Sequence, residues 1–284
     1  MSGTLYVVAT PIGNLEDITL RALRVLREVN VIAAEDTRRT ARLLSHHAIT
    51  GRTVSFHEHN TRSRVPRLIA RLEAGESVAI VTDAGTPGVS DPGLELVQAA
   101  IERGIAIDPI PGASAPLAAL IASGFPMVPF TVFGFAPSRS KARLEWLTAV
   151  AQTPHTFSFF EAPHRIQQTL GQAAGLFGER PIIAARELTK LHQEFLRGTA
   201  SELAKHISQA RGEFTMIVGP AVKQQESNEV CFTDDQVVNE FGRITNSGVC
   251  SRRAAIKQLA KKSGRTAKDV YSVIERSKTI GRMT

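Results

Sequence analysis

The residues best suited to chemistry lie in one loop that follows the apolar run Val78–Val81. This loop reads Asp83-Ala84-Gly85-Thr86-Pro87-Gly88-Val89-Ser90-Asp91-Pro92-Gly93. Glycine lets a ligand approach the backbone closely, proline fixes the direction of the chain, and the polar side chains can bond to backbone or ligand. An ordinary tight turn would explain a single Gly-Thr-Pro, but the density of such residues favours a ligand-binding loop.

Four further polar or Gly/Pro-rich segments follow apolar runs in the first half of the chain. They are Thr10–Leu15, Glu35–Arg38, His57–Asn60 and Pro111–Ala115. His57 and His59 allow a metal site as an alternative to a polar loop. Residues that alternate at a strand end point to opposite sides, however, which disfavours a shared metal.

The elements that must position these loops alternate between strand and helix. Strands are expected at Thr4–Ala9, Val31–Ala34, Val54–Phe56, Val78–Val81 and Ile105–Ile110, with helices from about Thr19, 63–74 and 93–103. This alternation predicts a parallel α/β sheet with right-handed crossovers, which binds ligands at the carboxyl ends of its strands. No Gly-x-Gly-x-x-Gly follows the first strand and no Walker loop occurs, so we expect several separated turns to hold the ligand.

The pattern breaks at Gly134–Lys141, where we place a boundary between domains. A second α/β domain follows, with a helix near 140–151, strands near 156–160, 181–185, 193–196 and 214–218, and polar loops at Glu161–Arg165 and Arg186–Lys190. The expected domains are residues 1–135, 136–222 and 230–284.

Composition narrows the class of protein. The chain has 284 residues, is 43% hydrophobic and contains two cysteines, so we expect a substantial core and neither a disulfide framework nor a zinc module. No apolar run reaches the roughly 18 residues needed to span a bilayer, and the first residues do not resemble a signal peptide. We therefore predict a cytoplasmic protein without a membrane anchor.

The net charge of +7 is concentrated at one end of the chain. Residues 243–284 contain 11 Lys and Arg against Asp269 and Glu275, whereas the rest is slightly acidic. Three short helical patterns occupy this end, with Thr233, Ser251 and Thr266 as expected caps and a tight turn at Gly264. Such a basic helix-turn-helix-like unit is typical of nucleic-acid binding, although a solvated helical face is an alternative.

The ordered motifs resemble one family. The segments Thr10–Leu15, Glu35–Arg38, Asp83–Gly93, Pro111–Ala115, Glu161–Arg165 and Arg186–Lys190 occur in this order in the small-subunit (16S) ribosomal RNA cytidine 2′-O-methyltransferases, which modify cytidine 1402. These enzymes belong to the tetrapyrrole methylase superfamily. The resemblance covers about residues 4–220 and the helical tail, and we find no departure at a motif position.

The resemblance implies a two-domain tetrapyrrole-methylase-like α/β enzyme, usually a homodimer, that folds S-adenosylmethionine into the cleft between its domains. It also implies that loop backbone holds most of this cofactor. The cofactor-binding residues expected on this basis are Pro11, Asp83, Gly85, Thr86, Pro87, Val89, Ser90, Ser114, Ala115, Phe160 and Leu188.

Methyl transfer to a ribose hydroxyl needs in-line alignment and gains from a base that removes the proton. Glu187, Lys190 and Asp36 are the candidates, because they lie at expected strand ends. Glu187 is favoured, with a bond to Arg186 or a turn cap as its alternative role. Lysine would need its pKa lowered by burial.

The expected RNA contacts are basic residues in both parts of the chain, since guanidinium groups clamp phosphate in two-point fashion. They are Arg38, Arg165, Arg186, Arg252, Arg253, Lys257, Lys261, Lys262, Arg265 and Lys268. We expect no metal. Two alternatives remain: methylation of a tetrapyrrole or another small molecule, which needs no basic tail, and a non-catalytic nucleic-acid-binding protein, which would not bind S-adenosylmethionine.

Overall fold

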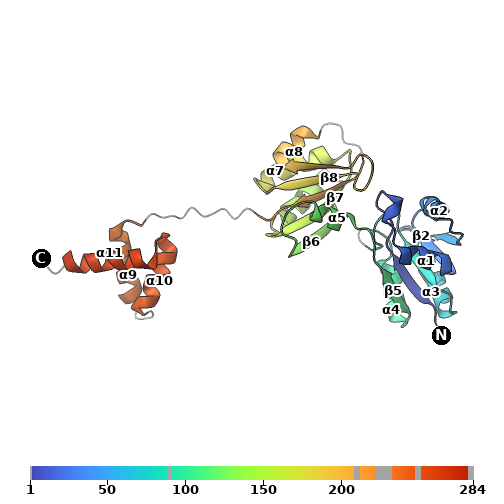
Figure 1. The fold of residues 1–284 in the computed structure, drawn as a ribbon, viewed down its shortest axis with the longest axis horizontal. Helices are drawn as coiled ribbons and strands as arrows, with labels where there is room; N and C mark the ends of the chain where they lie inside the picture. Colours follow the sequence, from blue (N-terminus) through green and yellow to red (C-terminus); the bar gives the residue numbers. More distant parts are fainter. Residues whose placement is uncertain (1, 89–90, 208–211, 222–231, 247–250, 281–284) are drawn as a thin grey trace. The chain divides into compact units, whose positions relative to one another are not determined.

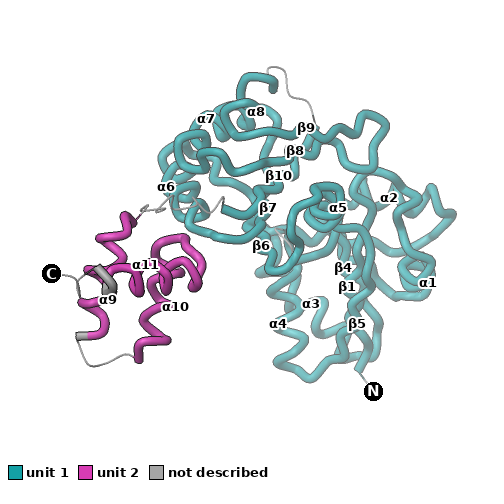
Figure 2. The backbone as a smooth tube through the Cα atoms, turned by 60° about the vertical axis from the view of Figure 1, so that its left-hand side comes forward, with its two compact units in different colours: residues 1–221 teal, residues 222–284 magenta. Residues whose placement is uncertain are grey.

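The computed structural model describes residues 2–88, 91–207, 212–221, 232–246 and 251–280. The chain forms two compact units, residues 1–221 and 222–284 (Figure 2). The first unit contains two five-stranded sheets, and the second is helical (Figure 1). Among the described residues, no helix combines the length and apolar character needed to cross a membrane.

The first sheet is parallel throughout, as its sequence predicts. Its strand order is β3-β2-β4-β1-β5. The strands are β1 (Thr4–Val8), β2 (Val31–Ala34), β3 (Thr53–Ser55), β4 (Val78–Val81) and β5 (Ala106–Ile110). Strands β2 and β4 are buried at every position, because helices cover both faces of the sheet.

Four helices cover the two faces of this sheet. They are α1 (Leu20–Glu28), α2 (Thr37–His46), α3 (Thr61–Glu73) and α4 (Leu94–Glu102), and a short 3-10 helix, η1 (Leu15–Asp17), precedes them. Val25 and Leu44 of α1 and α2 pack on one face of the sheet, and Leu68 and Leu96 of α3 and α4 pack on the other. Thr19 caps α1 as expected, since its hydroxyl accepts a hydrogen bond from the Ala22 amide. Helix α2 is not among the sequence-based expectations.

The second sheet is mixed, so the alternation of strand and helix does not continue as a parallel sheet. Its strand order is β6-β7-β10-β8-β9, and only β6 and β7 are parallel. The strands are β6 (Phe130–Phe135), β7 (Thr156–Glu161), β8 (Ile182–Arg186), β9 (Glu194–Gly198) and β10 (Phe214–Val218). The seven residues between β8 and β9 are too few for a crossover, so these two strands pair antiparallel.

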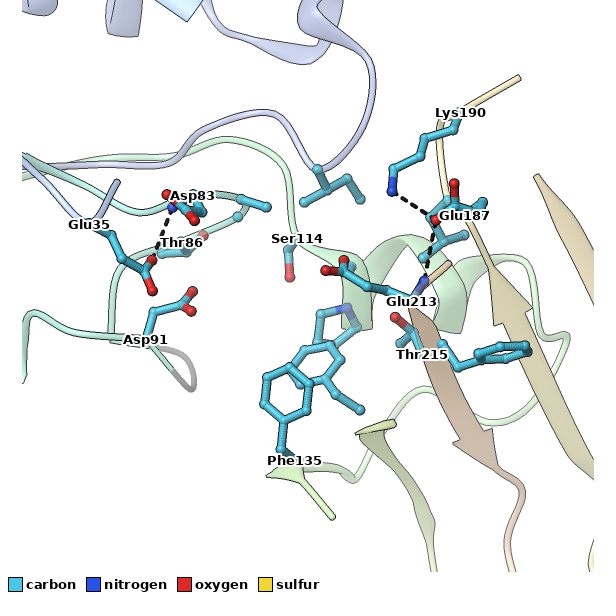
Figure 3. A pocket seen from close by; sticks show the side chains of 18 of the residues that line it. Glu35, Asp83, Thr86, Asp91, Ser114, Phe135, Glu187, Lys190, Glu213 and Thr215 are labelled. Carbon is cyan, nitrogen blue, oxygen red and sulfur yellow. Dashed lines mark hydrogen bonds and ion pairs between the residues drawn. The ribbon is translucent and has the colours of Figure 1, made fainter. Parts of the chain in front are cut away.

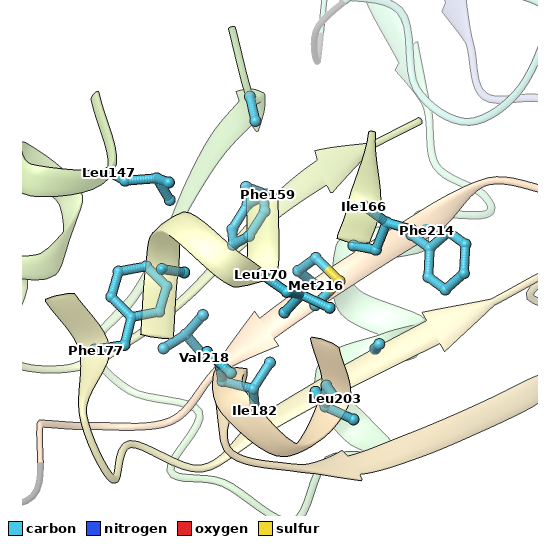
Figure 4. Packing of buried hydrophobic residues seen from close by; sticks show 14 of the residues in the cluster. Leu147, Phe159, Ile166, Leu170, Phe177, Ile182, Leu203, Phe214, Met216 and Val218 are labelled. Atoms are coloured by element: carbon cyan, nitrogen blue, oxygen red, sulfur yellow. The ribbon is translucent and has the colours of Figure 1, made fainter. Parts of the chain in front are cut away.

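The helices of this second lobe divide unequally between its two faces. They are α5 (Ala115–Ile121), α6 (Ser140–Ala151), α7 (Ile166–Phe177) and α8 (Ala200–His206). The last three pack on one face, where Leu147, Leu170 and Leu203 meet Phe159 and Met216 (Figure 4). Helix α5 packs on the other face. Strand β6, which ends at the expected boundary after residue 135, belongs to this second sheet. The limits 1–135, 136–222 and 230–284 stay predictions.

Three helices form the second unit: α9 (Asp234–Asn246), α10 (Arg252–Ser263) and α11 (Ala267–Ile280). They enclose a small core of Val237, Leu259, Val270, Val273 and Ile274. The expected caps are present: Ser251 accepts from the Ala254 amide, and Thr266 and Asp269 bond reciprocally. Gly264 ends α10 in the left-handed conformation (φ 66°) that glycine adopts without strain. The helix-turn-helix-like prediction therefore agrees with the structure of this unit.

Candidate active site

A cavity of about 330 Å³ lies where the loops of the first sheet meet the second lobe (Figure 3). The loops after β1, β2, β4 and β5 contribute to its wall, together with α5, β6, β7, β10 and the turn after β8. Its lining residues are Ile12, Glu35, Arg39, Asp83, Ala84, Gly85, Thr86, Asp91, Ser114, Ala115, Pro116, Phe135, Phe160, Glu187, Leu188, Lys190, Glu213, Phe214 and Thr215. The carboxyl ends of the parallel strands thus form one side of the cavity, as expected for an open α/β sheet.

Hydrogen bonds join three of these loops to one another. Thr10 and Gly85 exchange backbone bonds of 2.8 and 3.0 Å, and the Thr10 hydroxyl donates to the Thr82 carbonyl at 3.0 Å. Thr86 donates more weakly to the Ala113 carbonyl, at 3.5 Å. Gly85 has φ 84°, a conformation that strains residues with a Cβ. The glycine turn therefore fixes the cavity wall through its backbone.

A cluster of carboxylates lies on the first-sheet side. The Asp83 amide donates to Glu35 Oε2 at 3.1 Å, and Asp83 Oδ1 accepts from the Asp36 amide at 3.0 Å. Arg39 pairs with Asp83 at 3.3 Å. In Figure 3 the Asp91 and Glu35 carboxyl groups point toward each other. Arg39 is the one cation that pairs with this cluster among the described residues.

Burial, together with this shortage of positive charge, raises the pKa of two carboxyl groups in the cluster. Burial raises the pKa of Asp91 to about 7, and the charges of Glu35, Asp83 and Glu213 add to the effect. Burial also raises the pKa of Glu35, although the hydrogen bond from the Asp83 amide opposes this rise. Strongly shifted carboxyl groups in a cavity are typical of functional sites, because a fold without use for them would avoid the cost.

The turn after β8 forms the opposite side. Glu187 and Thr189 both have positive φ, 51° and 64°, which is uncommon for residues with side chains. Lys190 Nζ lies 2.8 Å from Glu187 Oε1, and this bond lowers the pKa of Glu187. The Glu213 amide also donates to Glu187 Oε1, at 3.3 Å. Glu187 therefore stays ionised and holds the turn, a structural role that is compatible with contact to a ligand.

The loop after β1 touches this turn directly. The Asn14 amide donates to the Thr189 hydroxyl at 3.0 Å. A Cβ on Gly13 would lie 2.7 Å from the Leu188 carbonyl oxygen and 2.6 Å from Lys190 Cγ. Only glycine allows the two loops this close, so the first-lobe loop and the β8 turn bound the cavity together.

Most of the expected cofactor-binding residues lie in the cavity wall. Those that line it are Asp83, Gly85, Thr86, Ser114, Ala115, Phe160 and Leu188, along with the base candidates Glu187 and Lys190. Pro11 and Pro87 do not line it, although each is next to a residue that does. Val89 and Ser90 lie outside the described residues.

Asp36, the third base candidate, does not line the cavity. Its carboxylate caps α2 by accepting from the Arg38 amide at 2.8 Å. Hydrogen bonds from the Arg38 side chain and backbone lower the pKa of Asp36 to about 2. A capping carboxylate with so low a pKa is a weak base, and Arg38 is occupied by the same interaction.

Several lining residues were not among the expected site residues. Glu35 directly precedes Asp36, and Asp91 lies in the same loop as Asp83. Their presence in motifs already singled out from the sequence is the signal that could have identified them. Glu213 and Thr215 reach the cavity because β10 lies between β7 and β8 in the sheet. No local sequence pattern predicts that order of strands.

The histidines at the end of β3 are not arranged as expected. Strand β3 ends at Ser55, so His57 and His59 lie in a turn, and their ring centroids are 6.0 Å apart. The expectation that they point to opposite sides was wrong, because strand alternation does not extend into the turn. Within the described part of the chain, no group of three or more His, Cys, Asp or Glu side chains could hold a metal ion.

The expected RNA-binding residues fall into two groups. Many are held in ion pairs: Arg38 with Asp36, Arg165 with Glu161, Arg186 with Glu194, Arg252 with Glu275, Lys262 with Glu240 and Arg265 with Asp234. Arg253, Lys257 and Lys268 are exposed, and the side chain of Lys261 lies outside the described part of the structure. Arg165 is committed to a fully buried carboxylate, which suits it to a structural role.

Comparison with known proteins identifies the family. A family model described as Tetrapyrrole (Corrin/Porphyrin) Methylases matches residues 4–204. The chain belongs to this family. The resemblance to tetrapyrrole methylases is therefore confirmed, and the chain is a methyltransferase.

Two relatives of this tetrapyrrole methylase carry the name Ribosomal RNA small subunit methyltransferase I. The protein from Halalkalibacterium halodurans is 45% identical over 273 residues, which is 95% of this chain and 94% of the relative. The protein from Micromonospora olivasterospora is 51% identical over 220 residues, 76% of this chain and 70% of the relative. The chain therefore belongs to the same family as these methyltransferases.

A solved structure supports the fold independently. Uroporphyrin-III C-methyl transferase from Thermus thermophilus, complexed with S-adenyl homocysteine, has a TM-score of 0.54 at 20% identity. The match covers 78% of this chain and 99% of that chain. The predicted tetrapyrrole-methylase-like α/β fold is confirmed.

Proposed function

We propose that this chain transfers a methyl group from S-adenosylmethionine to the 2′-hydroxyl of a cytidine ribose in the RNA of the small ribosomal subunit, at position 1402 of 16S RNA. The observation that carries the proposal is a carboxylate-rich cavity in a chain whose full-length relatives are named rRNA small subunit methyltransferases. The cytidine, its position and the ribose oxygen come from the resemblance of the motifs.

The residues of the cavity fit a cationic methyl donor. Phe135 and Phe160 lie with ring centroids 5.1 Å apart, and beside Leu188 they offer an apolar wall of the kind that accepts a nucleobase. Glu35 and Asp91 provide the negative charge that a sulfonium and an ammonium group would neutralise. When bound, S-adenosylmethionine supplies the reactive methyl group. The chain has to align the acceptor and take its proton.

We propose Asp91, coupled to Glu35, as the proton acceptor. A base works best when its pKa lies near the working pH, and the pKa of Asp91 is about 7. Burial raises the pKa of Asp91, the charge of Glu35 raises it further, and a bound cation would favour the ionised form of both carboxyl groups. The ribose proton would pass to Asp91 as the carbon–oxygen bond forms and the methyl–sulfur bond breaks, so that the donor would leave as neutral S-adenosylhomocysteine. Glu187 and Lys190 would then position the ligand at the opposite wall.

The negative charge of the lining carboxylates disfavours phosphate groups inside the cavity. Five carboxylates line it, against Arg39 and Lys190. A nucleoside can enter such a cavity, whereas the flanking phosphates must find cations elsewhere. We propose that the exposed Arg253, Lys257 and Lys268 of the C-terminal unit supply some of them.

Mass spectrometry of 16S RNA from a deletion strain tests the proposal. One missing ribose methyl group, restored by the wild-type gene and not by Asp91→Asn, is the expected result. An unchanged methylation pattern would refute the RNA substrate. Since the substrate lies in the small ribosomal subunit, a cytoplasmic location also follows as a prediction, and ultracentrifugation would test the predicted homodimer.

A small-molecule substrate is the second candidate, because structures of the same fold are named uroporphyrin-III methyltransferases. Removal of residues 222–284 discriminates between the two substrates. The compact unit 1–221 should keep its affinity for S-adenosylmethionine and lose most of its activity on small subunits. Unchanged activity on subunits would favour a substrate that needs no basic unit.

A further inference from the structure

A second cavity, of about 210 Å³, lies beside the edge of the first sheet. Four arginines line it: Arg52, Arg64, Arg67 and Arg71. Arg52 immediately precedes β3, which is the edge strand of the sheet. The other three lie on α3. The set, called here the arginine row, is distinct from the carboxylate-lined cavity.

The spacing of the arginine row follows from helix geometry. Arg64, Arg67 and Arg71 are three and four residues apart, so they lie along one side of α3. At 1.5 Å per residue they extend over about 10 Å. Val31, Val54 and Leu68 form the apolar remainder of the lining, against which the arginine stems can rest while their charged ends face solvent.

The charge of the arginine row is largely uncompensated. Arg71 pairs with Glu76 at 3.4 Å, and Arg64 makes a long bond of 3.4 Å to the Ser55 hydroxyl. Among the described residues, the guanidinium groups of Arg52 and Arg67 have no hydrogen-bond or ion-pair partner. Four guanidinium groups against one carboxylate attract an anion, and their planar forks match the oxygens of phosphate.

The position of the row links it to the reaction. Arg64 bonds to Ser55 at the carboxyl end of β3, and α3 runs back from there toward the amino end. In a parallel sheet the carboxyl ends of β2, β3 and β4 share one edge, and Glu35 and Asp83 of the first cavity follow two of those ends. The row thus begins, at Arg64, near the strand ends that carry the carboxylate cluster, and it extends toward the opposite strand ends, where Arg52 precedes β3.

We propose that the arginine row binds phosphate groups of the RNA that flank the modified nucleotide, as a second RNA contact within residues 1–221. This inference rests on the proposed function, because an RNA substrate supplies the phosphates. The uncharged nucleoside would occupy the carboxylate-lined cavity, and the negatively charged phosphates on either side of it would bind the arginine row.

The test is the salt dependence of RNA binding by the full chain. The double variant Arg52→Ala/Arg67→Ala removes the two unpaired cations, and Arg21→Ala/Arg24→Ala on α1 is the control, because it removes the same charge from the opposite face. Each lost phosphate contact lowers the slope of log K against log salt by about 0.7 to 0.9. Between 50 and 200 mM salt, wild type should thus lose about tenfold more affinity for small subunits than the row variant, while the control follows wild type.

Methylation of small subunits and titration with inorganic phosphate separate the outcomes. Methylation by the wild type tests the proposed function, whereas the salt slope tests the arginine row. A row variant with the slope of wild type overturns the inference even if methylation is normal. Titration with inorganic phosphate alone covers the other source of the ligand. A variant that weakens phosphate binding while the RNA slope stays unchanged would mark a small-anion site and would also overturn the RNA contact. Circular dichroism of both variants checks that they fold.

Discussion

Replacement of Asp91 by asparagine should stabilise the protein at alkaline pH while it slows methyl transfer. The pKa of Asp91 rises from an ordinary 3.8 to about 7 in the folded chain, so the native state holds a proton that the unfolded state has released. The contribution of Asp91 is favourable below pH 4, and it is lost as the pH rises from about 4 to 7. Above pH 7 the native state carries the full cost of an ionised, partly buried carboxylate.

The size of this effect follows from the shift. About 3 pH units at about 1.4 kcal/mol each give roughly 4 kcal/mol, and because Asp91 is only partly buried, solvent screening reduces this to about 2 kcal/mol. For a unit of some 200 residues, 2 kcal/mol corresponds to about 4 to 8 °C in Tm. Asp91→Asn should therefore melt about 5 °C above wild type at pH 8 and close to wild type at pH 4.

Thermal melts at pH 4, 6 and 8 measure the prediction, with the exposed Asp17→Asn as the matched control. Methyl transfer by Asp91→Asn should fall by at least about 100-fold, the usual contribution of a general base. A gain in Tm that is the same at pH 4 and pH 8 would contradict the electrostatic explanation. Activity near that of wild type would remove Asp91 from proton transfer.

Three further variants test other parts of the structure. Glu187→Gln removes the charge that pairs with Lys190 and should lower activity more than threefold, mainly through a higher KM for the methyl donor. Steady-state activity within threefold of wild type would end any role of Glu187 in the site. Gly13→Ala places a Cβ against the Leu188 carbonyl, so calorimetry should show at least about tenfold weaker binding of S-adenosylmethionine, and unchanged affinity would show that the two loops can separate without consequence. Arg180→Ala removes a buried guanidinium that donates to four backbone carbonyl groups, so the free energy of unfolding in urea should fall by about 3 to 5 kcal/mol. A decrease under about 1 kcal/mol would mean that water replaces these hydrogen bonds.

Local sequence patterns predicted much of the secondary structure because the physical reasons are local. Thr19, Ser251 and Thr266 cap helices, and Gly264 ends one, through bonds between near neighbours. The buried run Val78–Val81 is a central strand as its composition indicates. The same patterns missed α2, whose exposed face carries most of its polar residues, and strand β6, where Gly134 interrupts the apolar run.

The sequence also identified which loops form the site, but not which side chains. Asp83, Gly85 and Glu187 lie in motifs whose glycines, prolines and charges stand out without a structure. Asp36 and Glu35 are adjacent in one motif, and only the structure distinguishes them: Asp36 caps a helix outside the cavity, and Glu35 faces Asp91.

The sequence by itself thus determined the alternating α/β character, the loops rich in glycine and proline, and the basic helical end, since each depends on residues close together in the chain. The tertiary structure alone decided that the second sheet is mixed, that Glu213 reaches the cavity, and that burial among carboxyl groups from separate loops raises the pKa of Asp91 to about 7. Strand order and electrostatic coupling depend on distances between residues that lie far apart along the chain. No local pattern encodes those distances.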